Sequence, residues 1–321
     1  MTTRTTTSPE GRTAGPAVRL GVDIGGTKTA VALFDERDAA LARARAATPA
    51  AEGAAAVVAG VLELAARVLA EPAAAGTRLS GIGVGTAGVV APDGRTVAAA
   101  TEALPGWAGT PLAALLEDAL GAPTTVLGDV QAFLSGELAA GAALGARSAV
   151  AVMAGTGIGG AIAVEGAVVR GGHGAAGHIG HVPVAAAEGH RCPCGAWGHV
   201  EAVASGPAMT ALLRRERAHA AARDLRAVSA AAADGDAAAR TVLRLGGGAL
   251  GAALAGVVST LDPDVVVLSG GVLEAGPWYE DALRAELASR ALPLLRGTRV
   301  VRAALGADAV LLGAVSRAAV E

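Results

Sequence analysis

The sequence is poor in cysteine, aromatic residues and charge. Its 321 residues include 2 cysteines, 2% Phe, Trp and Tyr, and 17% Asp, Glu, Lys and Arg. Two cysteines cannot build a disulfide framework, so we expect a reducing, cytoplasmic setting. A formal net charge of −3 supplies no basic surface for nucleic acid or an anionic membrane. We therefore expect neither as a partner, and a small-molecule ligand is favoured.

Strongly hydrophobic runs are also scarce. The first 16 residues, MTTRTTTSPEGRTAGP, lack the apolar core of a signal peptide, and we expect a disordered leader. The one membrane-like run is 245–261, which contains no charged residue. A membrane span needs about 20 strongly apolar residues, whereas this run owes its hydropathy to Gly and Ala. The pattern favours a buried core helix.

The first chemical motif is DIGGTK, which follows the alternating apolar residues of a predicted strand at 18–24. Gly25 and Gly26 let backbone N–H groups approach a phosphate, and Thr27 adds a hydroxyl donor. Asp23, at the strand end, suits a hydrated magnesium ion. An ordinary hairpin with a glycine-rich turn would explain the same residues, and the motif is not the GxxxxGK[ST] phosphate loop.

The same arrangement recurs in the second half of the chain. A predicted strand at 148–153 runs into GTGIGG at 155–160, and a strand pair at 161–164 and 167–169 follows. Two glycine loops that face each other across a cleft resemble the actin, Hsp70 and hexokinase architecture, in which paired lobes clamp ATP. We therefore expect an α/β fold of two RNase H-like lobes with an interlobe cleft.

Asp129 stands directly after a short predicted strand at 124–127. Reacting groups in open α/β sheets lie at the carboxyl ends of strands, so this position suits chemistry. The alternative is a helix N-cap for residues 130–144. A later strand, 264–268, ends in SGGV, whose two glycines allow a flat ring to approach the backbone. Residues 205–244 favour helices and contain no motif that suggests chemistry.

The densest group of metal-binding side chains lies in residues 173–201, which hold five of the six histidines and both cysteines. Cys192 and Cys194 are too close for an unstrained disulfide, whereas two thiolates can bind one metal. Mixed nitrogen and sulfur ligands favour tetrahedral zinc. The expected ligands are His181, Cys192, Cys194 and His199. Spacing also leaves His173, His178 and His190 as substitutes, and a flexible loop with two free thiols is the alternative to a metal site.

GHIGH, CPCG and GH-V-E resemble the signature E-x-G-H, C-x-C-G-x-x-G-C-x-E of the ROK family of bacterial sugar kinases and sugar-responsive repressors. DIGGTK, LPGW at 104–107, Asp129, GTGIGG and SGGV follow in the family's order over about residues 18–320. The resemblance implies a glucokinase-like enzyme that transfers the γ-phosphate of ATP to a hexose hydroxyl, with a structural zinc. Family repressors carry a DNA-binding segment ahead of DxGGT, and the 22 residues before Asp23 favour the kinase branch.

The resemblance also implies a role for each matching residue. Asp129 would be the general base. The nucleotide and its magnesium ion would be bound by Asp23, Gly25, Gly26, Thr27, Lys28, Thr156, Gly157, Gly270 and Gly271. The substrate would be bound by Gly88, Gly128, Asp129, His178, His181 and Glu201.

Three positions depart from the family pattern. Position 199 usually holds cysteine, and histidine is a competent zinc ligand there. Gly128 replaces an asparagine and His178 replaces a glutamate, so the sugar loses one amide and one anionic acceptor. Glucose or a related hexose is therefore one candidate substrate. A modified sugar or a C7-cyclitol of the 2-epi-5-epi-valiolone type is the second, and a non-catalytic sugar-binding regulator is the third possibility.

These motifs suggest how the chain is divided. After the leader at 1–16, we expect a small lobe at 17–126 that a C-terminal helix at 308–321 completes. A large lobe at 127–307 would carry the zinc motif. We also expect a homodimer or a homotetramer.

Overall fold

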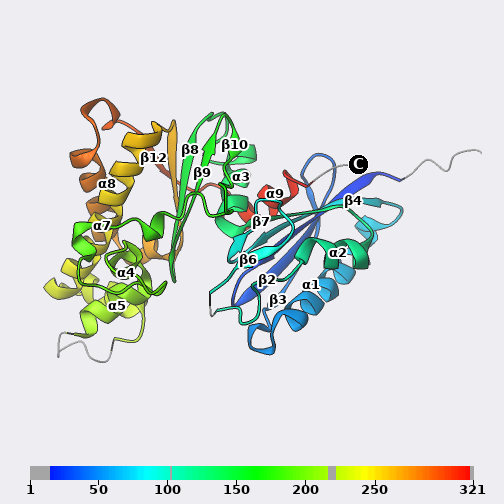
Figure 1. Ribbon diagram of the computed structural model, residues 1–321, viewed down its shortest axis with the longest axis horizontal. Helices are drawn as coiled ribbons and strands as arrows, with labels where there is room; N and C mark the ends of the chain where they lie inside the picture. The colour runs from blue at the N-terminus through cyan, green and yellow to red at the C-terminus, as the bar shows by residue number, and fades with distance from the viewer. Residues whose placement is uncertain (1–14, 102, 216–221, 319–321) are drawn as a thin grey trace, which may run out of the picture.

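The computed structural model describes residues 15–101, 103–215 and 222–318. Two five-stranded sheets form two lobes that lie side by side (Figure 1). Residues 1–14 of the predicted leader, and the last three residues of the predicted C-terminal helix, lie outside the described residues.

The first sheet has the strand order β3-β2-β1-β4-β7. β1 (Ala17–Ile24), β2 (Lys28–Phe34) and β3 (Ala40–Ala47) form an antiparallel meander. β4 (Arg78–Thr86) and β7 (Thr124–Gly128) then run parallel to β1. The carboxyl ends of these three parallel strands therefore meet at one edge of the sheet.

Helices cover both faces of this first sheet. On β2, Val31 packs in the cluster that contains α1 (Ala54–Leu69), whereas its neighbour Ala32 packs against α9 (Ala309–Val315). α2 (Leu112–Leu120) packs beside β7, and a small hairpin of β5 (Val89–Val90) and β6 (Val97–Ala99) lies next to the same strand.

The second sheet repeats the plan with the order β10-β9-β8-β11-β12. β8 (Ala149–Ala154), β9 (Ile158–Val164) and β10 (Ala167–Val168) form the antiparallel meander. β11 (Val265–Ser269) and β12 (Arg299–Arg302) run parallel to β8. The repeated topology confirms the predicted pair of RNase H-like lobes.

Helices of the second lobe pack on one face of this sheet around α7 (Ala237–Leu261), which holds the apolar run at 245–261. By length and composition α7 is the one described helix that could cross a membrane, but 56% of its most apolar window is buried within the protein. Its contact with α8 (Pro277–Arg290) is intimate, since a Cβ at Gly247 would lie 2.0 Å from the carbonyl oxygen of Tyr279. α7 is therefore packed as the predicted core helix. The second lobe also contains α4 (Glu201–Ala204), α5 (Gly206–Arg214) and α6 (Leu225–Ala233).

The two lobes meet where α3 (Asp129–Ala140) crosses α9 (Figure 1). A Cβ at Gly313 would lie 1.7 Å from the carbonyl oxygen of Ala132, so the two helices touch through their backbones. The buried cluster around this crossing also includes residues of β8, β9 and β11. The division expected between residues 126 and 127 falls inside β7, which pairs with β4 as far as Gly128.

Candidate active site

DIGGTK forms the tight turn between β1 and β2. The N–H of Gly25 donates to the carbonyl of Lys28 over 3.0 Å. Thr48, which sequence reasoning missed, fixes this turn: its hydroxyl donates to the carbonyl of Gly25 (2.7 Å) and its N–H donates to that of Thr27 (3.1 Å). Gly26 is half-buried, and the side chains of Thr27 and Lys28 are exposed. The loop therefore presents its donors to a ligand from a fixed backbone.

Asp23 and Asp129 stand at the same edge of the first sheet. Asp23 is the second-last residue of β1, and Asp129 directly follows β7. Burial and, to a smaller extent, the nearby charge of Asp129 raise the pKa of Asp23 to about 6, although the charge of Lys28 lowers it. The predicted magnesium ligand and the predicted base are thus brought into electrostatic contact.

Asp129 is the first residue of α3 and is half-buried. Burial raises the pKa of its carboxyl group, and this effect outweighs a hydrogen bond from the N–H of Val130 to Oδ1 (2.8 Å) and the charge of His178. The hydrogen bond fixes the direction of the carboxylate at a helix N-terminus, where negative charge is favoured. Asp129 therefore combines a proton-accepting carboxylate with a fixed orientation.

Gly128 and Gly88 lie beside this carboxylate. Gly88 has φ +106° and a Cβ there would lie 2.5 Å from the carbonyl oxygen of Ala99, so only glycine fits. Gly128 is different. Its φ of −61° and ψ of 147° suit any residue, and the nearest atom to a Cβ would be the carbonyl oxygen of Gly88 at 3.5 Å. A Cβ at position 128 would therefore make only ordinary van der Waals contacts.

The second glycine loop, GTGIGG, joins β8 to β9. Thr156 is exposed, and Gly157 is packed so tightly that a Cβ would lie 2.7 Å from Oε2 of Glu201. Oε2 also accepts the N–H of Ile158 over 2.7 Å, and Oε1 lies 3.9 Å from Sγ of Cys192. Glu201, at the start of α4, therefore links the glycine loop to the cysteine motif.

The four predicted metal ligands come together. Their ligand atoms all lie within 4.8 Å of one another: His181, Cys192, Cys194 and His199. Sγ of Cys192 is 3.7 Å from Nδ1 of His181, and Sγ of Cys194 is 3.2 Å from Nδ1 of His199. Bond lengths of about 2.0–2.3 Å place ligand atoms roughly 3.3–3.8 Å apart in a tetrahedral zinc site. The residues present therefore fit zinc.

His178 stands one turn before the metal cluster. Its exposed ring stacks on that of His181 with centroids 6.0 Å apart, and its Nδ1 lies 3.0 Å from the carbonyl oxygen of Ala175. Its charge is felt at Asp129, so it faces the region of the predicted base. His173 and His190, which spacing had left as substitutes, are not among the four clustered ligands.

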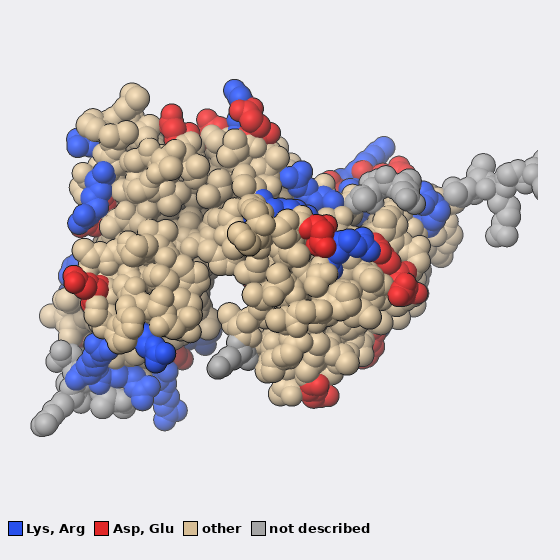
Figure 2. Space-filling model, viewed as in Figure 1, with Lys and Arg blue, Asp and Glu red and all other residues tan. Residues whose placement is uncertain are grey.

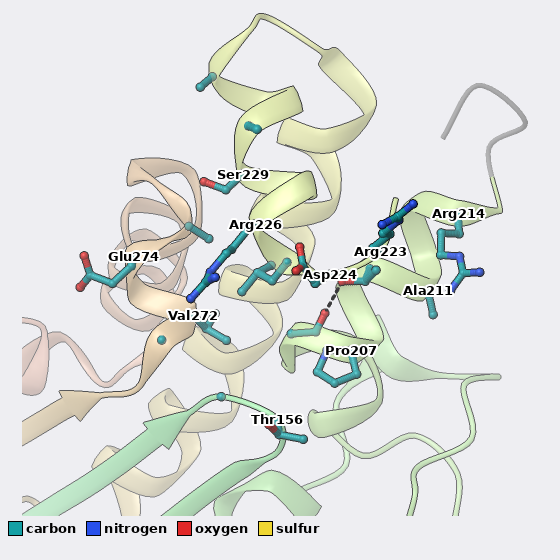
Figure 3. A pocket seen from close by; sticks show the side chains of 18 residues that line it. Thr156, Pro207, Ala211, Arg214, Arg223, Asp224, Arg226, Ser229, Val272 and Glu274 are labelled. Atoms are coloured by element: carbon teal, nitrogen blue, oxygen red, sulfur yellow. Dashed lines mark hydrogen bonds between the residues drawn. The ribbon is translucent and has the colours of Figure 1, made fainter. Parts of the chain in front are cut away.

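A pocket of about 940 Å³ opens in the second lobe. Thr156 lines one side of it, Gly271 to Ala275 line another, and residues of α5 and α6 form the rest (Figure 3). Gly270 has φ +102°, and a Cβ there would lie 2.2 Å from the carbonyl oxygen of Ala154, so only glycine lets this turn cross the end of β8.

Two thirds of the residues that line this pocket come from 205–244, the segment in which sequence reasoning found no motif. Arg223, Asp224, Arg226 and Ser229 surround the opening (Figure 3), and basic side chains gather at this end of the second lobe (Figure 2). No spacing signal marks these residues, because they come from the ends of helices that meet only in the folded protein.

The site thus has two parts. Asp23 and Asp129 lie at the edge of the first sheet, whereas Thr156 and Gly271 line the pocket of the second lobe. An opening separates the two lobes (Figure 2). A long ligand that occupied the pocket would have to extend toward the first lobe to reach both carboxylates.

Comparison with known proteins gives the family. The model of the ROK family matches residues 19–320, so the chain belongs to the ROK family. A glucokinase from Thermotoga maritima is 30% identical over an alignment of 310 positions, which covers 92% of this chain and 96% of the relative. An N-acetylmannosamine kinase from Salmonella heidelberg is 33% identical, over 92% of this chain and 96% of that protein. The bifunctional enzyme NanE/NanK from Brucella melitensis is 38% identical over 209 residues, and the match spans only 38% of its length.

Solved structures agree with the fold. A ROK hexokinase from Thermus thermophilus has a TM-score of 0.81 at 33% identity, covering 93% of this chain and 96% of that one. A ROK glucokinase from Streptomyces griseus, solved in complex with glucose and AMPPNP, has a TM-score of 0.76 at 30% identity, covering 93% and 98%. The expected hexokinase-type architecture is thereby confirmed.

Proposed function

We propose that this protein is an ATP-dependent sugar kinase that transfers the γ-phosphate to a hydroxyl of a hexose or hexose-like substrate. One observation carries this proposal: Asp129, whose carboxylate is oriented by the N–H of Val130, lies at the same sheet edge as Asp23 and the first glycine loop, and the second lobe repeats that loop. The matching glucokinases and N-acetylmannosamine kinases support the same chemistry. A cytoplasmic location and a homodimer or homotetramer are part of the proposal.

The nucleotide would occupy the pocket of the second lobe. Its base would lie beside Gly271, and its phosphates would run past Thr156 toward the glycine loop at Gly25 and Gly26. A magnesium ion, when bound, would be held by Asp23 through its water shell and would offset the charge of the phosphates. Thr27 and Lys28, which directly follow Gly25 and Gly26, are exposed.

Asp129 would accept the proton of the attacking hydroxyl. A carboxylate whose pKa is raised by burial is a stronger base than one in water, and the N–H of Val130 holds it in one direction. Phosphoryl transfer asks little else of the protein than alignment of the hydroxyl with the phosphate and stabilisation of charge.

The sugar would lie between Asp129 and the loop that carries His178 and His181. Two alternatives concern its identity. An unmodified hexose such as glucose is one, and the relatives named as glucokinases favour it. A modified sugar or cyclitol is the other, and Gly128 favours it because the amide side chain that the family pattern places there is absent. A regulator without catalysis has less support, because Asp129 and both loops are intact.

We also propose that the four-ligand cluster binds a structural zinc ion. Its chemical contribution would be to fix the loop at 178–201, because four protein ligands leave no coordination position open for water. Burial raises the pKa of the Cys192 thiol to about 11, so a bound cation is needed to hold that sulfur as a thiolate.

Replacement of Asp129 by asparagine tests the proposed function. Asp129→Asn keeps the shape of the side chain and removes its basicity, so kcat for sugar phosphorylation should fall by about 10²-fold or more while nucleotide affinity stays unchanged. Asp236→Asn, at the start of α7 where the side chain accepts an N–H over 2.7 Å, is the matched control and should retain wild-type kcat. Near wild-type turnover in Asp129→Asn would mean that another group is the base.

A further inference from the structure

The loop between β10 and His178 belongs to the second lobe in sequence but is docked on the first lobe. A Cβ at Gly174 would lie 1.8 Å from the carbonyl oxygen of Val90, in the small hairpin beside β7. Two side chains, Gln131 and Arg170, make hydrogen bonds that hold this loop in place. Neither belongs to a motif that the sequence analysis singled out.

Gln131 lies two residues after Asp129 and is 5% exposed. Its Oε1 accepts the N–H of Gly128 over 3.3 Å, and its Nε2 donates to the carbonyl oxygen of Gly174 over 3.3 Å. One amide therefore joins the backbone next to the proposed base to the loop that leads to His178. Both ends of a buried amide are satisfied only if these two segments keep their separation.

Arg170 makes a second connection from the other end of the loop. Its Nη1 donates to the carbonyl oxygen of Val126, in β7, over 3.0 Å. The N–H of Val126 donates to the carbonyl oxygen of Gly94 over 2.9 Å. The guanidinium of Arg170 lies so close to Gly94 that a Cβ at Gly94 would be 2.9 Å from Nη1. Val126 in β7, three residues before Asp129, is thereby tied to Arg170 at the start of the loop.

We propose that Gln131 and Arg170 are positioning residues that hold the sugar-side loop, residues 170–181, in register with the strand end that carries Asp129. The inference rests on the proposed kinase function. A sugar bound by that loop must present one hydroxyl to Asp129, and the two come from different lobes. Because reaction rates depend steeply on alignment, with about 1 Å of misplacement costing as much as 10²-fold, a fixed separation between these segments has catalytic value.

The structural alternative is that Gln131 only stabilises α3. Gln131→Met separates the two roles, because it keeps the length of the side chain and removes both hydrogen bonds. The matched control is Ser135→Ala: Ser135 is also 5% exposed, lies one turn further along α3 and donates only to the carbonyl of Gln131 within the helix (3.0 Å).

We expect Gln131→Met to raise the KM for the sugar and to lower kcat, with kcat/KM for the sugar reduced by roughly 10- to 100-fold. The KM for ATP should change by less than about twofold, because neither Gln131 nor any residue of the sugar-side loop lines the nucleotide pocket. Ser135→Ala should leave both constants near wild type. A Gln131→Met protein with lowered melting temperature and wild-type sugar kinetics would overturn the inference.

Arg170→Met keeps the test decisive if Gln131→Met does not fold, since Arg170 lies outside the helix core. Its control is Arg299→Met, which removes a guanidinium bond of the same kind, to the carbonyl of Ala142 over 2.8 Å, away from the sugar-side loop. We expect Arg170→Met to raise the sugar KM as Gln131→Met does, and Arg299→Met to leave it unchanged. Equal kinetics in the two arginine variants would refute the role of Arg170.

Amide hydrogen exchange separates failure of this inference from failure of the proposed function. In the protein without ligands, Gln131→Met and Arg170→Met should each speed exchange in residues 171–181 by at least about tenfold, while Ser135→Ala should not. This readout needs no kinase activity. An inactive wild-type enzyme with faster loop exchange in the variants would overturn the kinase proposal alone, and unchanged loop exchange would overturn the positioning role.

Discussion

Replacing Gly128 with asparagine should improve the use of glucose. Position 128 is one of the two sugar-side positions that depart from the family pattern. Its backbone already suits a residue with a Cβ: φ is −61°, and the nearest atom to a Cβ would be 3.5 Å away, an ordinary van der Waals distance. An asparagine there would place an amide beside Asp129, on the side where the sugar is proposed to lie. The change therefore adds a polar group on a Cβ that makes only ordinary van der Waals contacts.

The magnitude follows from one hydrogen bond. A neutral hydrogen bond contributes about 0.5–1.5 kcal/mol, which corresponds to roughly a two- to twelvefold lower KM for glucose. His178→Glu would restore a charged acceptor, whose hydrogen bond is worth about 1.5–3 kcal/mol. The double variant should therefore prefer glucose over modified sugars by more than either single variant does.

The assay is a coupled ADP measurement on a panel of hexoses, aminosugars and cyclitols. Gly128→Ala is the matched control, because it adds the Cβ and lacks the amide, and its glucose KM should stay at or above the wild-type value. If Gly128→Asn and Gly128→Ala raised the glucose KM alike, the amide would not reach the sugar. A wild-type enzyme that ranks glucose above every analogue, with a sub-millimolar KM, would show that other residues compensate for both departures.

Two further predictions concern the zinc cluster and the carboxylate of Asp23. Purified protein should contain about one zinc per chain by elemental analysis, and Cys194→Ala should lose metal and melting temperature together; full stability without metal would contradict a structural zinc. Because the folded pKa of Asp23 is raised from 3.8 to about 6, its contribution to stability is present below pH 4 and is lost as the pH rises to about 6. Without nucleotide or magnesium, Asp23→Asn should therefore be more stable than wild type above pH 6, by up to roughly 3 kcal/mol in denaturant titrations, and an equal stability difference at pH 4 and pH 7 would argue against it.

Sequence alone predicted the parts of the site that are local in the chain. DIGGTK and GTGIGG specify turns between adjacent strands, so pattern and structure coincide at both loops. The two cysteines and two histidines lie within 19 positions of one another, and the structure brings their ligand atoms together. The repeated strand and glycine pattern likewise predicted two lobes of one architecture.

Other parts of the site depend on contacts between distant segments. Arg226 lines the pocket only because α6 packs near the turn after β11, and no spacing rule connects Arg226 with Gly271, 45 positions later. Gln131 carries no motif, and its bond to Gly174 spans 43 positions. Thr48 belongs to no motif in the sequence, yet its hydroxyl holds the first glycine loop. Such bonds are set by packing of the whole lobe, which periodicity does not describe.

The placement of α9 affects the order in which the protein can be completed during synthesis. This helix, the last described element of the chain, lies on the backbone of the first strands: a Cβ at Gly83 would be 2.0 Å from the carbonyl oxygen of Ala314, and Phe34 packs beside Leu311. Translation proceeds from the N-terminus, and domains generally fold as they emerge. One apolar face of the first sheet must therefore stay uncovered until the ribosome has passed residue 315, after every strand of the second sheet has been made.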